Sequence, residues 1–294
     1  MISDRDVEFY RENGYLVVPD ALSHAQLEAL RTDTERVVAG AAAVTENDKT
    51  YDLEDSHSAA TPRVRRIKNP LDVMPSSWAI GTDERVLGIL ARLIGPDIRL
   101  QKAKLNMKSA GFGAAVEWHQ DWAFYPHTND DLLAMGVMLD DTDLDNGPML
   151  MLPGSHRGPV YDHHAEGYFC GAIDPGACDI DFDSAAVPLT GKAGSLTFHH
   201  VRMVHGSALN TSAHARRLLL YQYQAADAWP LAEHYPSLDD YARMVVAGSP
   251  TTQPRLAPVP VRMPLPAALN DGSIYENQRT RRSRYFELAA DAAE

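Results

Sequence analysis

The chain has 294 residues, 45% of them hydrophobic, which is enough for one large domain with a buried core. Its 40 acidic and 27 basic residues give a net charge of −13, which argues against nucleic acids or membrane surfaces as partners because both are anionic. The start lacks a basic and apolar leader, and no apolar run is long enough to span a bilayer, so we expect a soluble, cytoplasmic protein.

The first hundred residues show mainly helical patterns. Each predicted helix has a capping residue or a glycine stop, and the three cover residues 3–13, 23–43 and 83–94. A short strand is expected at 15–18, and the polar stretch 45–62 is expected to be a mobile loop. This region is therefore predicted to be a helical N-terminal part, residues 1–97, of a single domain.

From residue 98 onward, short apolar segments alternate with Gly, Pro, Asn and Asp. The candidate strands are 99–108, 115–121, 132–139, 148–152, 195–199, 201–206 and 217–225. This density of strands predicts a mainly β fold, either a sandwich or a jelly roll, with the core at 98–225. Residues 226–294 are expected to form a C-terminal extension, in which the proline-rich stretch 255–266 is extended. The two cysteines, Cys170 and Cys178, lack the spacing of a zinc site.

His119 and Asp121, both of residue types that bind metals, are separated by one residue. In a strand this spacing places both side chains on the same face. A third ligand would come from the segment 198–207, which contains three histidines. Two histidines and one carboxylate form the facial triad of non-haem iron(II) oxygenases, which leaves positions for a bidentate co-substrate and dioxygen. The pair alone is a weak signal, because such tripeptides occur by chance in many proteins.

Arg216 strengthens the interpretation as an iron oxygenase. It follows His205 after a turn, at the start of what we expect to be an adjacent strand, from which it can reach the same barrel mouth. Its guanidinium suits the distal carboxylate of 2-oxoglutarate, whose keto acid end chelates iron. A register error of one residue would exchange its role with that of Arg217.

Two other functions are weighed against an oxygenase. A cupin-like metal-dependent hydrolase or isomerase would use the same barrel ligands, but it needs no buried cation beside the metal. A non-catalytic jelly-roll binding protein has no reason to combine two histidines with a carboxylate.

The chain resembles the phytanoyl-CoA dioxygenase family in the segments WHQDWAFYP (118–126), DNGPMLMLPGSHRG (145–158), GSLTFHHVRMVHGSALNTS (194–212) and RR (216–217). The resemblance covers roughly residues 98–225, with a weaker echo in ENGYLVV at 12–18. It implies a double-stranded β-helix of the jelly-roll, cupin-like type with helical additions. The iron ligands that it implies are His119, Asp121 and His205.

The resemblance also implies a co-substrate site and a reaction. Arg216 and Ser207 would hold the 2-oxoglutarate carboxylate, and Asn106 matches a co-substrate contact of ectoine hydroxylase-like members. The expected reaction uses Fe(II), 2-oxoglutarate and O2 to hydroxylate an unactivated C–H bond of a small molecule, with release of succinate and CO2. Because Asp121 is present, no iron position is vacant for halide, so hydroxylation is favoured over halogenation. Desaturation or epoxidation would use the same site.

The substrate pocket is expected to include residues that follow the metal strand and residues of the next strand. These are Gln120, Trp122, Tyr125, Ala134 and Gly136. The aromatic members are as often plain core, whereas glycine at position 136 predicts a roomier pocket. His200 and His156 are interpreted as structural, and His199 equally as structural or as a donor behind the metal ligands.

Two further segments are considered for the mouth of the site. The segment around 273–276 and the loop 45–66 are the candidates for a cover that excludes water. The basic residues of these regions are interpreted as solvated surface rather than as contacts to an anionic substrate: Arg63, Arg65, Arg66, Lys68, Arg279, Arg281, Arg282 and Arg284.

Overall fold

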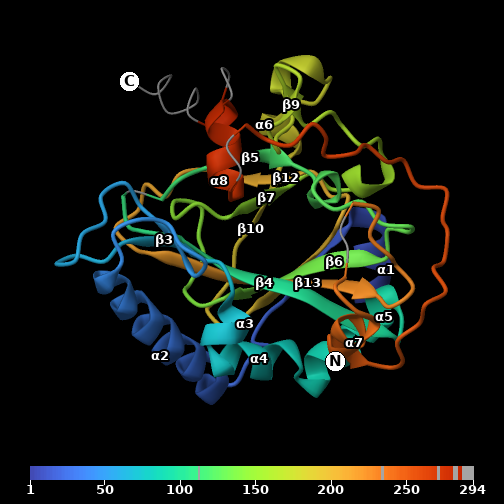
Figure 1. Cartoon of the computed structure of the whole chain (residues 1–294), viewed down its shortest axis with the longest axis horizontal. Helices are drawn as coiled ribbons and strands as arrows, with labels where there is room; N and C mark the ends of the chain where they lie inside the picture. Colours follow the sequence, from blue (N-terminus) through green and yellow to red (C-terminus); the bar gives the residue numbers. More distant parts are fainter. Residues whose placement is uncertain (112, 233–234, 270–271, 281–283, 287–294) are drawn as a thin grey trace.

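Two antiparallel sheets face each other across the interior of the protein (Figure 1). The structure is a computed structural model, and it describes residues 1–111, 113–232, 235–269, 272–280 and 284–286. The strands of the larger sheet are β1 (Tyr15–Val18), β2 (Tyr51–Leu53), β3 (Val64–Ile67), β4 (Ile98–Lys108), β6 (Leu132–Met138), β11 (Leu196–His200), β13 (Arg216–Ala225) and β14 (Val245–Ala247). Their order is β1-β11-β6-β13-β4-β3-β2, and β14 also pairs with β4.

The smaller sheet covers the inner face of the larger one. Its strands are β5 (Val116–His119), β7 (Met149–Met151), β10 (Val187–Leu189) and β12 (His205–Ser207), in the order β10-β7-β12-β5. A separate hairpin pairs β8 (His164–Ala165) with β9 (Tyr168–Phe169). The prediction of a mainly β, jelly-roll fold with helical additions is confirmed.

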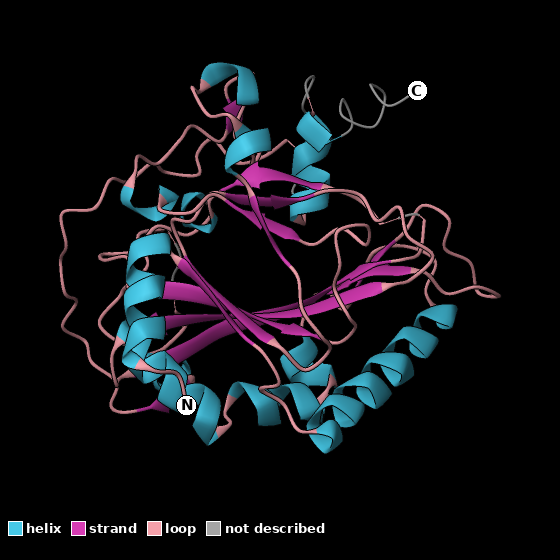
Figure 2. Ribbon diagram, turned by 180° about the vertical axis from the view of Figure 1, so that it is seen from behind, coloured by secondary structure: helices cyan, strands magenta, loops and turns pink. Residues whose placement is uncertain are grey.

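Helices lie along the outer face of the larger sheet, on the side away from the smaller sheet (Figure 2). The helices are α1 (Asp4–Asn13), α2 (His24–Gly40), α3 (Pro70–Val73), α4 (Pro75–Gly81), α5 (Glu84–Ile94), α6 (Phe182–Ala185), α7 (Leu238–Arg243) and α8 (Ile274–Asn277). Of these, α6 and α8 lie instead on the side of the smaller sheet, and α1 stands beside the larger sheet next to β1 (Figure 1). In the described part of the chain, no helix is both long and apolar enough to cross a membrane.

The strand β13 separates the apolar core from the cavity between the sheets. Leu219 packs in the large cluster beneath the helices, together with Leu30 of α2 and Leu90 of α5. Its neighbours Leu218 and Leu220 face the other way and line the cavity. This alternation follows from the period of two residues in a strand, and it decides which polar side chains reach the interior.

Several local predictions are confirmed. Ser23 caps α2 through a capping box, and Gly14 ends α1 in the left-handed conformation with φ 79°. The strand β1 has the predicted bounds, and α2 and α5 occupy their predicted ranges. The stretch 255–266 contains neither helix nor strand, as expected.

Other local predictions are wrong. The expected loop 45–62 contains β2, and the N-terminal part contributes three strands to the larger sheet as well as its helices. Residues 201–204 form a turn, so the last histidine-bearing strand begins only at His205. The reason is that β11 and β12 belong to different sheets, and the chain must cross between them.

Candidate active site

Three buried side chains gather where the two sheets meet. His119, Asp121 and His205 each offer one ligand atom, and these atoms all lie within 4.8 Å of one another. His119 ends β5 and Asp121 begins a short 3-10 turn, while His205 begins β12. Nε2 of His119 lies 3.9 Å from Oδ1 of Asp121. Two imidazoles and one carboxylate in such proximity have the composition of an iron(II) facial triad.

The backbone fixes the orientation of both imidazoles. Nδ1 of His119 lies 2.8 Å from the carbonyl oxygen of Glu117, and Nδ1 of His205 lies 3.0 Å from that of Met203. A hydrogen bond from Nδ1 to a carbonyl requires the proton on Nδ1 and leaves Nε2 with its lone pair free. Both rings therefore present an Nε2 that can bind a metal ion.

The electrostatics keep the three groups in their metal-binding forms. Burial lowers the pKa of His119 to about 4 and that of His205 well below its ordinary value, so both are neutral at neutral pH. Burial alone would raise the pKa of Asp121, but the His199 ring and the charge of Lys104 hold it well below its usual range. Neutral imidazoles and an ionised carboxylate are the forms that coordinate a divalent cation.

His199 lies directly behind the carboxylate. It projects from β11 of the larger sheet, is 1% exposed, and places Nε2 3.5 Å from Oδ2 of Asp121. Its ring centroid is 4.5 Å from that of His205. His200 faces away and lies beside His156, with 5.2 Å between the ring centroids. These placements agree with the expected orientations, although they arise from two separate strands rather than from alternation along one.

The three ligand candidates line a cavity between the inner faces of the sheets. The other polar residues that line this cavity are Arg66, Lys104, Asn106, Lys108, His199, Ser207, Arg216 and Gln222. The three residues predicted to bind the co-substrate, Asn106, Ser207 and Arg216, are thus in the same cavity as the triad. Lys108 is also there, and its Nζ donates to the backbone oxygens of Ser207 and Ala208.

Arg216 is 3% exposed, and its Nε donates to the carbonyl oxygen of Gly147 at 3.1 Å. Burial lowers its pKa to about 10, so the guanidinium stays charged at neutral pH. One detail of the prediction is wrong: the strand of Arg216 is not a neighbour of the strand of His205. It lies in the opposite sheet, and the two residues share the cavity because the inner faces of the sheets oppose each other.

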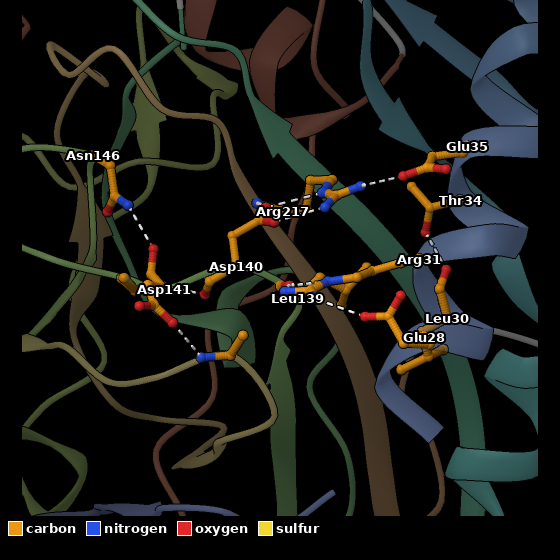
Figure 3. Close-up of polar contacts among 12 residues, drawn as sticks. Glu28, Leu30, Arg31, Thr34, Glu35, Leu139, Asp140, Asp141, Asn146 and Arg217 are labelled. Atoms are coloured by element: carbon orange, nitrogen blue, oxygen red, sulfur yellow. Dashed lines mark hydrogen bonds and ion pairs between the residues drawn. The ribbon is translucent and has the colours of Figure 1, made fainter. Parts of the chain in front are cut away.

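Arg217 points out of the cavity, as the alternation along β13 requires. Its Nε and Nη2 donate to the two oxygens of Asp140 at 2.9 and 2.6 Å, and Nη1 lies 4.0 Å from Glu35 (Figure 3). This bidentate pair occupies the guanidinium. Of the two adjacent arginines, only Arg216 is therefore available to a ligand in the cavity.

Four of the five residues expected in the substrate pocket divide into two that line a cavity and two that do not. Ala134 lines the cavity of the triad, and Tyr125 lines an adjoining outer cavity. Gln120 and Trp122 do not line either cavity. The side chain of Gln120 binds the backbone at Pro159, Tyr161 and Arg202, and Nε1 of Trp122 donates to Pro260 at 2.8 Å. These two side chains hold loops in place.

Gly136 provides no extra room in the pocket. A Cβ at this position would lie 2.5 Å from Oγ1 of Thr197 and 3.2 Å from Cδ1 of Leu218. The space that a side chain would need is thus occupied by residues of the two neighbouring strands, β11 and β13. The expectation of a roomier pocket is wrong, and close strand packing explains the glycine.

Two of the expected surface arginines are buried. Arg65 is 5% and Arg66 8% exposed, and both stack on the ring of Tyr275 at 5.3 and 5.0 Å. Lys68 forms an ion pair with Asp52 at 2.7 Å. Arg279 is partly exposed and contacts Asp55, whereas Arg281 and Arg282 lie outside the described residues.

The two segments proposed as a cover meet at the cavity. Ile274 and Tyr275 of α8 form part of its wall, and Arg66 forms another part. Asn47 donates to Glu276 at 2.9 Å, which joins the loop to α8. Sequence reasoning missed Arg66, Lys104 and Lys108 as cavity residues. The two lysines could have been predicted from the sequence, because Lys104 and Lys108 alternate with Asn106 on one face of β4.

Comparison with known proteins gives a consistent result. The sequence profile of the phytanoyl-CoA dioxygenase family matches residues 10–218, and the chain belongs to this family. It is 39% identical over 280 residues to a probable alpha-ketoglutarate-dependent hypophosphite dioxygenase of Stutzerimonas stutzeri, covering 94% of this chain and 97% of that protein. It is 29% identical to the L-proline trans-4-hydroxylase of Streptomyces griseoviridis, over 75% and 86% of the two chains.

Solved structures agree on the fold. The structure of EctD from S. alaskensis with bound Fe matches with a TM-score of 0.68 and 22% identity, over 87% of this chain and 88% of that one. Together with the relatives, this identifies the chain as an iron- and 2-oxoglutarate-dependent dioxygenase with a jelly-roll fold.

Proposed function

We propose that His119, Asp121 and His205 bind Fe(II), and that Arg216, with Ser207 and Asn106, binds the carboxylate of 2-oxoglutarate. The observation that carries this proposal is the presence of the triad and the buried Arg216 guanidinium in one cavity. The donor set fits the metal, because each imidazole has a free Nε2 and the carboxylate is ionised. Arg216 is a buried cation that has no carboxylate partner among the described residues, and such a cation fits a dicarboxylate co-substrate.

When bound, iron and 2-oxoglutarate would activate dioxygen for the hydroxylation of a small molecule. Succinate and CO2 would be the other products. The residues of this chain position and protect that chemistry. The strand pair β5 and β12 holds His119 and His205, and Arg216 would hold the distal carboxylate of 2-oxoglutarate. Tyr275 and Ile274 form part of the wall of the cavity, which would limit the access of water.

The alternatives from other functional classes lack this support. A cupin-like hydrolase or isomerase would need no guanidinium in the metal cavity, and a binding protein would need no triad. Arg216 distinguishes these functions, because a co-substrate with a carboxylate would give its guanidinium an anionic partner that the other two functions do not require. The test is whether 2-oxoglutarate binds to the Fe(II) protein under anaerobic conditions. Binding to wild type that is strongly weakened in Arg216→Ala is the expected result.

Hypophosphite is the first substrate to assay, because the S. stutzeri relative named for it aligns over nearly the full length of both chains. Transfer of one oxygen atom to the P–H bond would give phosphite, and the other oxygen atom would enter succinate. Formation of phosphite and succinate in equal amounts, dependent on iron, supports this assignment. Formation of succinate without phosphite, at the same rate with and without hypophosphite, counts against it.

A further inference from the structure

The cavity of the triad opens into a second, outer cavity. The residues that line both are Arg66, Lys104, Asp121 and Ile274. The outer cavity adds Lys68 and Lys102, together with aromatic residues, whereas the inner cavity adds Lys108 and Arg216. Arg66 and Lys104 therefore stand at the junction, beside the carboxylate of Asp121. A molecule that enters the inner cavity from the outer one would therefore pass these two residues.

We propose that Arg66 and Lys104 bind an anionic group of the substrate and that the substrate is a small, compact oxyanion. This inference rests on the proposed function, since it assumes that Arg216 holds 2-oxoglutarate at the other end of the inner cavity. It assigns the residues that determine substrate specificity.

The charges in the two cavities support an anionic substrate. Among the described lining residues, Asp121 is the one carboxylate, against six lysine and arginine side chains. Of these, Lys108 has a pKa that burial and the charge of Arg216 lower well below its ordinary value. Fe(II) with Asp121, and the two carboxylates of 2-oxoglutarate with Arg216, together leave no net charge. Arg66 and Lys104 then add positive charge that no further carboxylate among the described lining residues balances. Such a concentration of positive charge in a protein with a net charge of −13 attracts anions selectively to this opening.

Arg66 is held in place for a ligand. Its Nε donates to Oδ1 of Asn106 at 2.9 Å, and its guanidinium lies 5.0 Å from the centre of the Tyr275 ring. The residue is 8% exposed, yet its Nη2 is buried and has no hydrogen-bond partner among the described residues. Asp52 is 4.0 Å away and already binds Lys68 at 2.7 Å. A buried guanidinium nitrogen without a partner favours a ligand that accepts its hydrogen bond.

Lys104 approaches the same point from the neighbouring strand. It projects from the face of β4 that also carries Asn106, and β3 pairs with β4 so that Arg66 lies opposite Asn106. A guanidinium and an ammonium on adjacent strands can bind two oxygens of one tetrahedral or planar anion. Ile274, Tyr275 and Phe124 supply apolar walls around this position. The site therefore favours an anion with a small apolar or hydrogen-bearing remainder.

The test measures binding rather than turnover. Methylphosphonate, acetate and the uncharged dimethyl methylphosphonate are titrated calorimetrically into the anaerobic Fe(II) protein saturated with 2-oxoglutarate. Wild type is expected to bind at least one anion and not the neutral ester, and the affinity should fall as salt is added. Comparison of the phosphonate with the carboxylate shows which oxyanion the pair prefers. Failure of both anions to bind, or equal binding of the ester, overturns the inference.

The variants are Arg66→Gln and Lys104→Met, with Arg63→Gln as the matched control. Arg63 precedes Arg66 by three residues and donates to Ser56, outside both cavities. Each cavity variant should weaken anion binding about ten- to hundredfold, the range expected for one charged hydrogen bond, and the control should bind like wild type. Unchanged anion binding in both cavity variants overturns the inference.

The affinity for 2-oxoglutarate, measured in the same samples, separates this inference from the proposed function. It should change little in Lys104→Met, which carries this comparison, because Arg66→Gln also removes the hydrogen bond to Asn106 of the proposed co-substrate site. If wild type does not bind 2-oxoglutarate, the proposed function fails. If 2-oxoglutarate binds normally and the anions ignore Arg66 and Lys104, only the present inference fails. Lys104→Met keeps the test decisive where Arg66→Gln lowers the yield of folded protein.

Discussion

His119 and His205 are direct partners across the antiparallel strands β5 and β12, with 4.1 Å between their ring centroids. The backbone ladder fixes the separation of directly opposed residues, so two of the three proposed ligands are positioned by the sheet itself. Asp121 joins them from the turn that follows β5. The three side chains thus come from β12, from the end of β5 and from the turn that directly follows β5.

The first prediction concerns the metal ligands. His119→Ala, Asp121→Ala and His205→Ala should each weaken Fe(II) binding by more than about a hundredfold, since even residues behind the ligands contribute about ten- to hundredfold. Equilibrium dialysis under anaerobic conditions measures the affinity. His200→Gln is the control, because this ring faces Asp130 and His156 rather than the triad. Loss of iron in the control, together with its retention in His205→Ala, would contradict the assignment.

The second prediction concerns the two adjacent arginines. Arg216→Ala should raise the Kd for 2-oxoglutarate by a factor that corresponds to about 2–5 kcal/mol, because the partner carboxylate is left buried without its cation. Iron affinity should stay near that of wild type. Arg217→Ala removes the same charge but only breaks the pair with Asp140, so it should lower stability slightly and leave the Kd unchanged. Equal Kd values in wild type and Arg216→Ala would refute the co-substrate site.

The third prediction is a pH dependence of stability in the metal-free protein. Burial lowers the pKa of His163 to about 3, and the ring accepts from the backbone N–H of Gln120. Below its ordinary pKa of about 6.5, the unfolded chain binds a proton that the folded chain does not, so stability present above pH 6.5 is lost as pH falls. The contribution is about 1.4 kcal/mol per pH unit between about pH 6.5 and 3. Denaturant unfolding at pH 7, 6 and 5 measures it.

His163→Gln provides the comparison for this pH dependence. Its unfolding free energy should be lower than that of wild type at pH 7 but should fall less steeply between pH 6 and 5. Identical slopes in the two proteins would show that His163 takes up its proton equally in the folded and unfolded states.

The fourth prediction concerns the close approach of strands at Gly136. Gly136→Ala should destabilise the fold by about 1–3 kcal/mol, the usual cost of overpacking, because the new Cβ would meet Thr197 at 2.5 Å. Gly88→Ala in α5 is the matched control. Its nearest contact would be Met1 at 3.4 Å, and alanine favours the helix, so stability should rise slightly. A larger loss at Gly88 than at Gly136 would reverse this account.

The sequence predicts those features that depend on neighbouring residues. The cap at Ser23, the stop at Gly14 and the opposite directions of Arg216 and Arg217 all follow from local rules. The position of Arg66 does not, because it depends on the pairing of β3 with β4, which brings Arg66 opposite Asn106. Such pairing between distant segments leaves no periodic signal in a polar stretch, so a cavity residue was interpreted as solvated surface.

The site shows the same division. The spacing of His119 and Asp121 is a local motif, and the resemblance to a family supplied His205. The roles of Gln120 and Trp122 could not be read from their proximity to the motif, because each side chain turns toward a loop far along the chain. Proximity in sequence to a metal ligand therefore does not place a side chain in the substrate cavity.

One titration tests the central claim, that the triad holds iron and Arg216 holds 2-oxoglutarate in the same cavity. 2-Oxoglutarate is added to the anaerobic Fe(II) protein, and the visible absorption of the iron-bound keto acid is recorded. Wild type should show a band that saturates at one equivalent, Arg216→Ala the same band at much higher concentration, and His205→Ala no band. Absence of the band in wild type, or an unchanged band in His205→Ala, would contradict the account.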